Sequence, residues 1–257
     1  MAILDTGIDT DHPDLAGNVY KSGDKPSNGK DDDKNGYVDD TYGLNAINGK
    51  GSGQDDNGHG THVSGIVAGR GNNDVGVTGT CWSSKLLAVK FMNSKGKGST
   101  SAAIAGIQYA VKQGFKIINC SFGSSSKSSS LHDAVDYAQD HNTLLVVAAG
   151  NDSENIDKHP LYPASYTDSN ILAVAASTSD DTLADFSNFG ATGVDVAAPG
   201  DSIYSTYLGG GYRILSGTSM AAPYVAGVAG CCASRSRMPP TATCATRSAT
   251  RSTSRPP

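Results

Sequence analysis

Short apolar runs alternate along the chain with segments in which apolar residues recur at steps of three and four. Runs of the first kind are typical of strands buried on both faces of a sheet, and segments of the second kind are typical of amphipathic helices. The expected strands are 86–89, 117–118, 144–149, 171–175 and 194–197, and the expected helices between them are 100–113 and 130–140. This β-α-β alternation predicts an α/β fold of three layers, α/β/α, with a mainly parallel central sheet.

Loops rich in Gly, Asn, Asp and Ser interrupt the alternation at 21–60, 123–130 and 150–160. Ligands of open parallel sheets bind outside the carboxyl ends of the strands, so we expect these long loops to carry the functional site. The 257 residues suffice for one large domain or two small ones. No run of about 18 apolar residues is present, so we expect no membrane span and no membrane partner.

The composition changes abruptly near residue 231. Residues 1–233 hold all 25 acidic residues, whereas residues 234–257 hold five Arg and no acid. We therefore expect a folded domain over 1–233 and a disordered low-complexity Arg/Ser/Thr/Pro tail over 234–257. The tail is either a basic arm or the product of a shifted reading frame or chimeric end. It has no aromatic side chain to stack on bases, so we expect no nucleic-acid partner.

Five cysteines are an odd number, and no C-x-x-C pair is present. Neither a disulfide framework nor a zinc site is therefore indicated. Cys120 follows an apolar run in an expected strand, and we interpret it as a small buried thiol.

Three segments put chemically active side chains at strand and helix ends. Asp5 leaves an apolar strand in ILDTGID, His59 opens an apolar helix in NGHGTHVSG, and Ser219 follows a Gly turn at a helix start in SGTSMAAP. A serine hydroxyl is a weak nucleophile that needs a base within hydrogen-bond reach, and the base needs an orienting acid. Taken singly, these side chains also fit a turn residue, a helix-start residue and an N-terminal cap. Together they fit one nucleophilic mechanism.

With these motifs and a fourth segment, AAGN at 148–151, the sequence from residue 1 to about 230 resembles the subtilisin-like serine peptidases, the subtilase family. The order Asp, His, Ser is that of the subtilisins and not that of chymotrypsin or the α/β-hydrolases. The resemblance implies a subtilisin-like fold and a serine endopeptidase. In such an enzyme, Ser219 would attack the scissile carbonyl, His59 would transfer the proton and Asp5 would orient His59. Asn151 matches the oxyanion-hole Asn of the family, and His62 is left to packing.

The resemblance also implies that a peptide or protein substrate adds as a strand between two backbone edges. Residues 96–98 and 121–123 align with these edges, and both contain glycine, as close approach of another backbone requires. A pocket of small walls suggests an uncharged, apolar residue before the scissile bond. Ordinary strand and turn roles stay open for all these positions. The expected substrate-binding residues are Gly96, Lys97, Gly98, Ser121, Phe122, Gly123 and, for the pocket, Ala148, Gly150 and Leu161.

An acidic loop, DDDKNGYVDD, spaces oxygen ligands like the first part of an EF-hand calcium loop, with Gly36 at the sixth place. The final bidentate Glu is missing, because the twelfth place is Tyr42. Five acids in ten residues repel one another without a cation, although a solvated acidic loop is the alternative. The expected calcium ligands are Asp31, Asp33, Asn35, the carbonyl of Tyr37, Asp39 and Asp40.

A second calcium site follows from the resemblance alone. Asp14 and Asn73, the latter in NNDVGV, match the high-affinity calcium site of the family, although one family ligand comes from residues ahead of the first strand. Relatives of this kind commonly carry a signal and an inhibitory propeptide there, whereas Met1 stands four residues before Asp5 and no signal peptide is recognisable. The resemblance therefore implies a secreted, calcium-stabilised monomer whose partners are substrates and a propeptide or inhibitor.

Two other functions stay open at this point. A truncated, non-catalytic chain would keep the motif residues, fold poorly and at most bind peptides. An acidic calcium-binding module would explain residues 31–40 but none of the other motifs.

Overall fold

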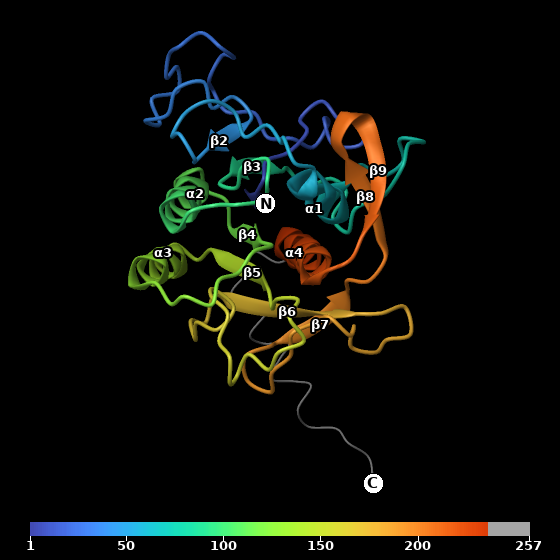
Figure 1. Cartoon of the computed structure of the whole chain (residues 1–257). Helices are drawn as coiled ribbons and strands as arrows, with labels where there is room; N and C mark the ends of the chain where they lie inside the picture. The colour runs from blue at the N-terminus through green and yellow to red at the C-terminus, as the bar shows by residue number, and fades with distance from the viewer. Residues whose placement is uncertain (236–257) are drawn as a thin grey trace.

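A central sheet of seven parallel strands organises the fold (Figure 1). The computed structural model describes residues 1–235, and the predicted tail, except for its first two residues, lies outside them. The strand order is β2-β3-β1-β4-β5-β6-β7, and every neighbouring pair is parallel. The strands are β1 (Ala2–Asp5), β2 (Gly43–Asn45), β3 (Leu87–Lys90), β4 (Ile117–Cys120), β5 (Leu144–Ala148), β6 (Ile171–Ser177) and β7 (Val196–Pro199).

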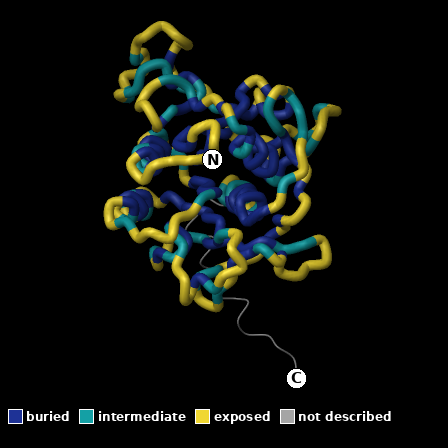
Figure 2. Tube along the Cα trace, in the orientation of Figure 1, coloured by how far each residue is buried: buried dark blue, intermediate teal, exposed yellow. Residues whose placement is uncertain are grey.

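Two helices cover each face of the sheet, which confirms the predicted three-layer α/β/α architecture. Figure 1 shows α2 (Thr100–Lys112) and α3 (Ser129–Asp140) on one side, and α1 (His59–Ala68) and α4 (Thr218–Arg235) on the other. The side chains of Ser99 and Ser128 cap α2 and α3 by accepting from backbone N–H groups three residues on. The exposed residues lie mainly in the connecting loops (Figure 2).

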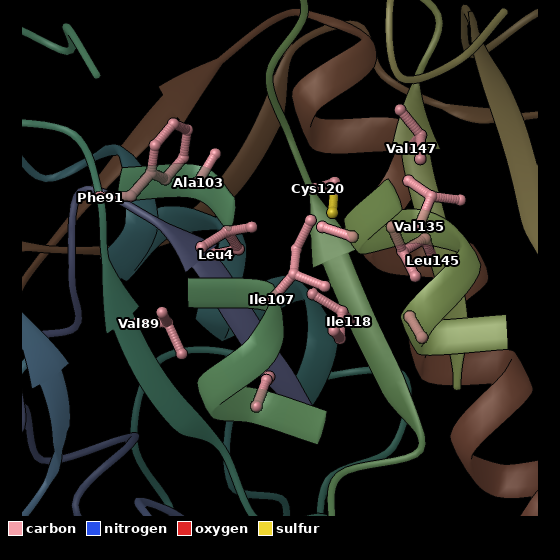
Figure 3. Packing of buried hydrophobic residues seen from close by; sticks show 14 of the residues in the cluster. Leu4, Val89, Phe91, Ala103, Ile107, Ile118, Cys120, Val135, Leu145 and Val147 are labelled. Carbon is pink, nitrogen blue, oxygen red and sulfur yellow. The ribbon is translucent and has the colours of Figure 1, made fainter. Parts of the chain in front are cut away.

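Apolar residues run continuously in the strands because both faces of the sheet are buried. In β1, Leu4 joins the hydrophobic cluster under α2 and α3, whereas Ile3 joins the cluster on the opposite face. In β5, Val147 belongs to the cluster under α2 and α3, whereas Val146 belongs to a cluster on the opposite face. Figure 3 shows the first cluster, in which Leu4, Ile107 and Ile118 pack together. Cys120 is fully buried, as predicted, and burial raises the pKa of its thiol.

A two-stranded antiparallel hairpin, β8 (Ile203–Tyr207) and β9 (Gly211–Leu215), was not predicted. It packs on α1, where the Nε2 atom of His62 lies 3.0 Å from the carbonyl oxygens of Ile203 and of Arg213. The predicted packing role of His62 is confirmed by these contacts and by its burial. The short 3-10 turn η1 (Leu208–Gly210) joins the two strands.

The C-terminal helix extends two residues past the predicted domain boundary. α4 ends at Arg235, so residues 234 and 235, which we expected in the tail, are helical. The Sγ atom of Cys231 in this helix lies 2.7 Å from that of Cys81, which joins the end of α4 to the turn before β3. Within residues 1–235, no helix is long and apolar enough to cross a membrane.

The topology brings the expected functional residues to one edge of the sheet. β1 lies between β3 and β4, so the chain leaves β1 toward one side and later returns on the other. Such a reversal of strand order opens a crevice at the carboxyl ends of the strands. Asp5 ends β1, Ser121 follows β4, and Asn151 follows β5 after two residues, so all three reach this crevice.

Candidate active site

Asp5 and His59 are joined by a short hydrogen bond. Oδ1 of Asp5 lies 2.8 Å from Nδ1 of His59 and also accepts from the backbone N–H of Thr6. His59 is the first residue of α1, and Asp55 holds that helix start because its carboxylate accepts from the N–H groups of Gly58 and Thr61. The imidazole is therefore fixed from two directions.

The surroundings of His59 favour its protonated form. Burial by itself lowers the pKa of His59, but the charge and hydrogen bond of Asp5 outweigh burial and raise the pKa above its ordinary value. Asp5 is fully buried, and its Oδ2 has no hydrogen-bond partner among the described residues. A carboxylate in this setting stabilises a positive charge on the imidazole ring facing it.

Lys90 supports the loop that follows Asp5. It lies opposite Asp5 in the register of β3 with β1 and is 5% exposed. Its Nζ donates to the carbonyl of Thr6 at 2.8 Å and to Asp56 at 2.6 Å. The sequence did not single out Lys90, because a lysine at a strand end gives no signal of burial.

Ser219 is the second residue of α4, and its backbone is held by an unusual contact. Pro223, four residues on, has no N–H to donate to the carbonyl of Ser219. The hydroxyl of Ser121 donates to this carbonyl instead, at 2.9 Å. In return, the Ser219 hydroxyl donates to the carbonyl of Ser121 at 3.2 Å, and no hydrogen bond joins Ser219 to His59 within the described part of the chain.

Asn151 is oriented by the residue before Ser219. Its Oδ1 accepts from the backbone N–H of Thr218 at 2.8 Å and from the Thr218 hydroxyl at 2.9 Å. Because Oδ1 is taken by these donors, the Nδ2 group is left to face the cleft. Thr218 stands in the quoted SGTSMAAP motif, but the motif alone assigned it no task.

A cleft of about 480 Å³ collects these side chains. Both predicted substrate edges reach it: Gly96, Gly98 and residues 121–123 all line the cleft. Lys97 lies in the same turn with an exposed side chain. The residues of the cleft include Thr6, Asn57, His59, Phe91, Gly96, Gly98, Ser121, Phe122, Gly123, Asn151, Tyr162 and Ser219.

The three predicted pocket residues lie outside this open cleft. Of the residues that the structure describes, Ala148, Gly150 and Leu161 do not line it, and Ala148 is only 3% exposed. Leu161 does reach Gly150, because a Cβ on that glycine would lie 2.6 Å from Leu161 Cδ2. The structure thus brings the leucine to the glycine but leaves no open pocket between them.

The acidic loop gathers three carboxylates, one of them unexpected. Oxygens of Asp24, Asp31 and Asp33 lie within 4.8 Å of one another. Asp24 was missed because it stands outside the ten-residue acidic run. The side chain of Asp39 instead accepts from the N–H groups of Asn28 and Gly29. Like charges at this spacing repel, and hard oxygen donors of this kind suit calcium.

Backbone N–H groups donate to the carboxylates of Asp24, Asp31 and Asp33, and Asp40 and Asn35 are used in hydrogen bonds as well. Asp40 is buried, and its Oδ2 accepts from Tyr109 at 2.6 Å and from Asn35 at 2.8 Å. Burial raises the pKa of Asp40 although these bonds act to lower it. Oδ1 of Asn35 accepts from the N–H of Tyr37. Asn35 and Asp40 therefore hold the loop in place beside the three-carboxylate cluster.

The second predicted metal site is a hydrogen-bonded carboxylate. The structure brings Asn73 to Asp14, with Nδ2 of Asn73 donating to Oδ1 at 2.7 Å. The N–H of Val77 donates to Oδ2 at the same distance. A cation at Asp14 would need Asn73 to turn its carbonyl oxygen inward.

Comparison with known proteins agrees with the motifs and the fold. A model described as "Subtilase family" matches residues 1–254. Thermitase of Thermoactinomyces vulgaris is 43% identical over 237 residues, which cover 92% of this chain and 75% of that protein. The thermophilic serine proteinase of Bacillus sp. (strain AK1) is 40% identical over 237 residues, which cover 92% of this chain and 52% of that protein.

A solved structure shares the architecture. The crystal structure of a cold adapted subtilisin-like serine proteinase matches with a TM-score of 0.72 and 30% identity, over 89% of this chain and 72% of that one. The chain therefore spans about half to three quarters of the length of these relatives.

Proposed function

The chain belongs to the subtilase family of serine proteases, and on this premise we propose that it hydrolyses peptide bonds with Asp5, His59 and Ser219 as the catalytic groups. The observation that carries the proposal is the 2.8 Å hydrogen bond between Asp5 and His59, at the wall of the cleft that also contains Ser219. A buried acid that orients an imidazole beside a serine is the arrangement that activates a hydroxyl.

The reaction begins when the Ser219 hydroxyl turns from the carbonyl of Ser121 toward Nε2 of His59. His59 takes the proton as Oγ attacks the scissile carbonyl carbon, and the Asp5 carboxylate stabilises the imidazolium. The tetrahedral species expels the amine, which receives the proton from His59, and an acyl-enzyme on Ser219 remains. Water, activated by the same imidazole, then hydrolyses the acyl-enzyme.

The negative charge on the carbonyl oxygen falls to Asn151. Its Nδ2 faces the cleft because Thr218 occupies Oδ1, and the N–H of Ser219 at the start of α4 is the second donor. We expect Asn151→Ala to lower kcat by about 10²–10³, the range known for a subtilisin, with little change in KM.

Protein or peptide substrates bind in extended form between two edges of the cleft. Gly96, Gly98 and residues 121–123 line it, and Gly96 and Gly98 have no side chain to block main-chain pairing. Main-chain hydrogen bonds of this kind tolerate many sequences. An extracellular location, as the resemblance implies, would suit such an enzyme.

Calcium binding belongs to the same proposal. The carboxylates of Asp24, Asp31 and Asp33 are the residues that would hold the ion, which would neutralise their mutual repulsion and stiffen the acidic loop. The loop leads into β2 and lies on a different part of the chain from the catalytic motifs, so calcium has a structural task here and takes part in no step of the reaction.

Labelling with a fluorophosphonate probe tests the proposal, because the probe reacts with an activated serine and needs no guess about the substrate. We expect labelling of the folded protein, none of Ser219→Ala, and much slower labelling of Asp5→Asn. Ser84→Ala, which changes a serine outside the cleft, is the matched control and should label normally. A folded protein that does not label would instead favour a non-catalytic peptide binder.

A further inference from the structure

Leu161 fills the space between two glycines beside the cleft. A Cβ on Gly123 would lie 2.5 Å from Leu161 Cδ2, and a Cβ on Gly150 would lie 2.6 Å from the same atom. One methyl group therefore touches both backbones where neither has a side chain. We call the space between Gly123 and Gly150 the glycine slot.

The glycine slot is where the side chain before the scissile bond has to go. Gly123 continues the segment after β4, Gly150 follows β5, and these two strands are paired neighbours in the sheet. In the proposed reaction the scissile carbonyl lies between Ser219 and Asn151, and both residues line the same cleft as Gly123. A peptide paired with residues 121–123 thus directs the side chain of its acyl residue between the two glycines.

The leucine is anchored at its backbone. The N–H of Leu161 donates to the hydroxyl of Ser165 at 3.0 Å, and its carbonyl accepts from the N–H of Ser165 at 2.8 Å. The next residue, Tyr162, exchanges two backbone hydrogen bonds with Ser124, at 2.8 and 2.9 Å. These bonds tie the leucine to the substrate edge itself, so the side chain cannot leave the glycine slot by a shift of the whole loop without breaking them.

The open cleft ends where the leucine begins. Among the described residues, it reaches Gly123, Asn151 and Tyr162 but not Gly150 or Leu161. A large side chain would have to enter a space already occupied by a methyl group, and overpacking of this kind is unfavourable. Glycine and alanine place at most one methyl group there.

We propose that Leu161 closes the glycine slot and makes this protein select substrates with glycine or alanine before the scissile bond. This inference rests on the proposed peptidase function. It also replaces the expectation of a pocket open to apolar side chains in general, because the Leu161 side chain fills the space between the two glycines and does not merely line it.

The test compares internally quenched peptides that differ only in the residue before the scissile bond: Gly, Ala, Leu or Phe. We expect kcat/KM of the unaltered protein to be at least tenfold higher for Ala than for Phe. Leu161→Gly should shift the Ala-to-Phe ratio toward Phe by roughly 10- to 200-fold, and Leu161→Ala should shift it less. Leu183→Gly, which alters an exposed leucine away from the cleft, should leave the ratio unchanged.

Two results would overturn the inference: equal or better cleavage after Phe by the unaltered protein, or an unshifted ratio in an active Leu161→Gly variant. Failure of the proposed function is seen separately, as a folded protein that the fluorophosphonate probe does not label. In that case, binding of peptides ending in Ala or Phe to Ser219→Ala decides the matter. Tighter binding of the Ala peptide, reversed by Leu161→Gly, supports the closed slot, and equal binding of the two peptides refutes it.

Discussion

The hydroxyl of Ser121 links the segment 121–123 to α4, the helix that carries Ser219. The Ser121→Ala variant would remove this hydroxyl. This hydroxyl donates to the carbonyl of Ser219 and accepts from the side-chain amide of Asn119, each at 2.9 Å. Ser121, Asn119 and Ser219 are all buried. A buried polar group left without a partner costs about 1–3 kcal/mol, so we expect the substitution to lower the free energy of unfolding by about 2–4 kcal/mol.

Pro223→Ala provides the rescue that makes this prediction specific. An alanine at position 223 has an N–H, which can donate to the carbonyl of Ser219 four residues earlier, as in an ordinary helix. In the double variant, that carbonyl regains a donor, while Asn119 does not. The double variant should therefore be more stable than the sum of the single effects implies, by about 1–2 kcal/mol, the cost of one orphaned carbonyl.

Urea unfolding of the four proteins of this cycle measures the coupling. All four would carry Ser219→Ala, which keeps the backbone carbonyl and prevents digestion of unfolded molecules. Equal m-values would show that the unfolded states are comparable. Single effects that add to within about 0.5 kcal/mol would refute the reasoning, because they would mean that the Ser121 hydroxyl does not replace the donor missing at Pro223.

Three further predictions concern titration and calcium. Asp5 raises the pKa of His59 against the effect of burial, so the acid limb of the labelling rate should lie above about pH 6.5 and should move lower in Asp5→Asn. Burial lowers the pKa of His62 to about 4, so the unfolded chain binds more protons than the fold between about pH 6.5 and 4. Stability should fall by about 3 kcal/mol as the pH drops through this window, and His62→Gln should remove that part of the slope in urea unfolding. Calcium should raise Tm progressively with its concentration, an effect that EDTA and Asp24→Asn abolish and Asp39→Asn retains.

Six of the seven sheet strands and the four helices could be predicted because their signal is local and hydrophobic, whereas the three-residue β2 lies inside the loop predicted over 21–60. The β8–β9 hairpin could not, because its buried face is polar: the hydroxyls of Ser205 and Thr206 donate to the carbonyls of His62 and Thr61 in α1. The exposed side of the hairpin carries large residues, with Tyr204 54% exposed. Buried Ser205 and Thr206 next to exposed Tyr204 and Ile214 break the alternation of apolar and polar positions, so periodicity did not reveal either strand.

The chemical groups of the site could be predicted as a set, but their supports could not. Each proposed catalytic residue lies in a short motif with its own glycine turn, and such motifs can be recognised without tertiary structure. Lys90 and Asp24 are ordinary residues in sequence, and only the fold brings them to Thr6 and to the carboxylates of the acidic loop. Likewise, the motif does not show that Pro223, the sixth residue of α4, leaves the carbonyl of Ser219 to the hydroxyl of Ser121.

The glycine slot shows why substrate preference is harder to predict than reaction type. The roles proposed for Ser219 and Asn151 follow from the residues of their own motifs, whereas the depth of the slot depends on the side chain of Leu161 from a third segment. Gly123 was expected at a substrate edge and Gly150 and Leu161 in a pocket, yet two glycines and a leucine describe an open apolar pocket and a filled one equally well. Only the position of Cδ2 between the two backbones separates these cases. The backbone bonds from Ser165 and Ser124 that anchor this leucine segment lie between loops far apart in the sequence.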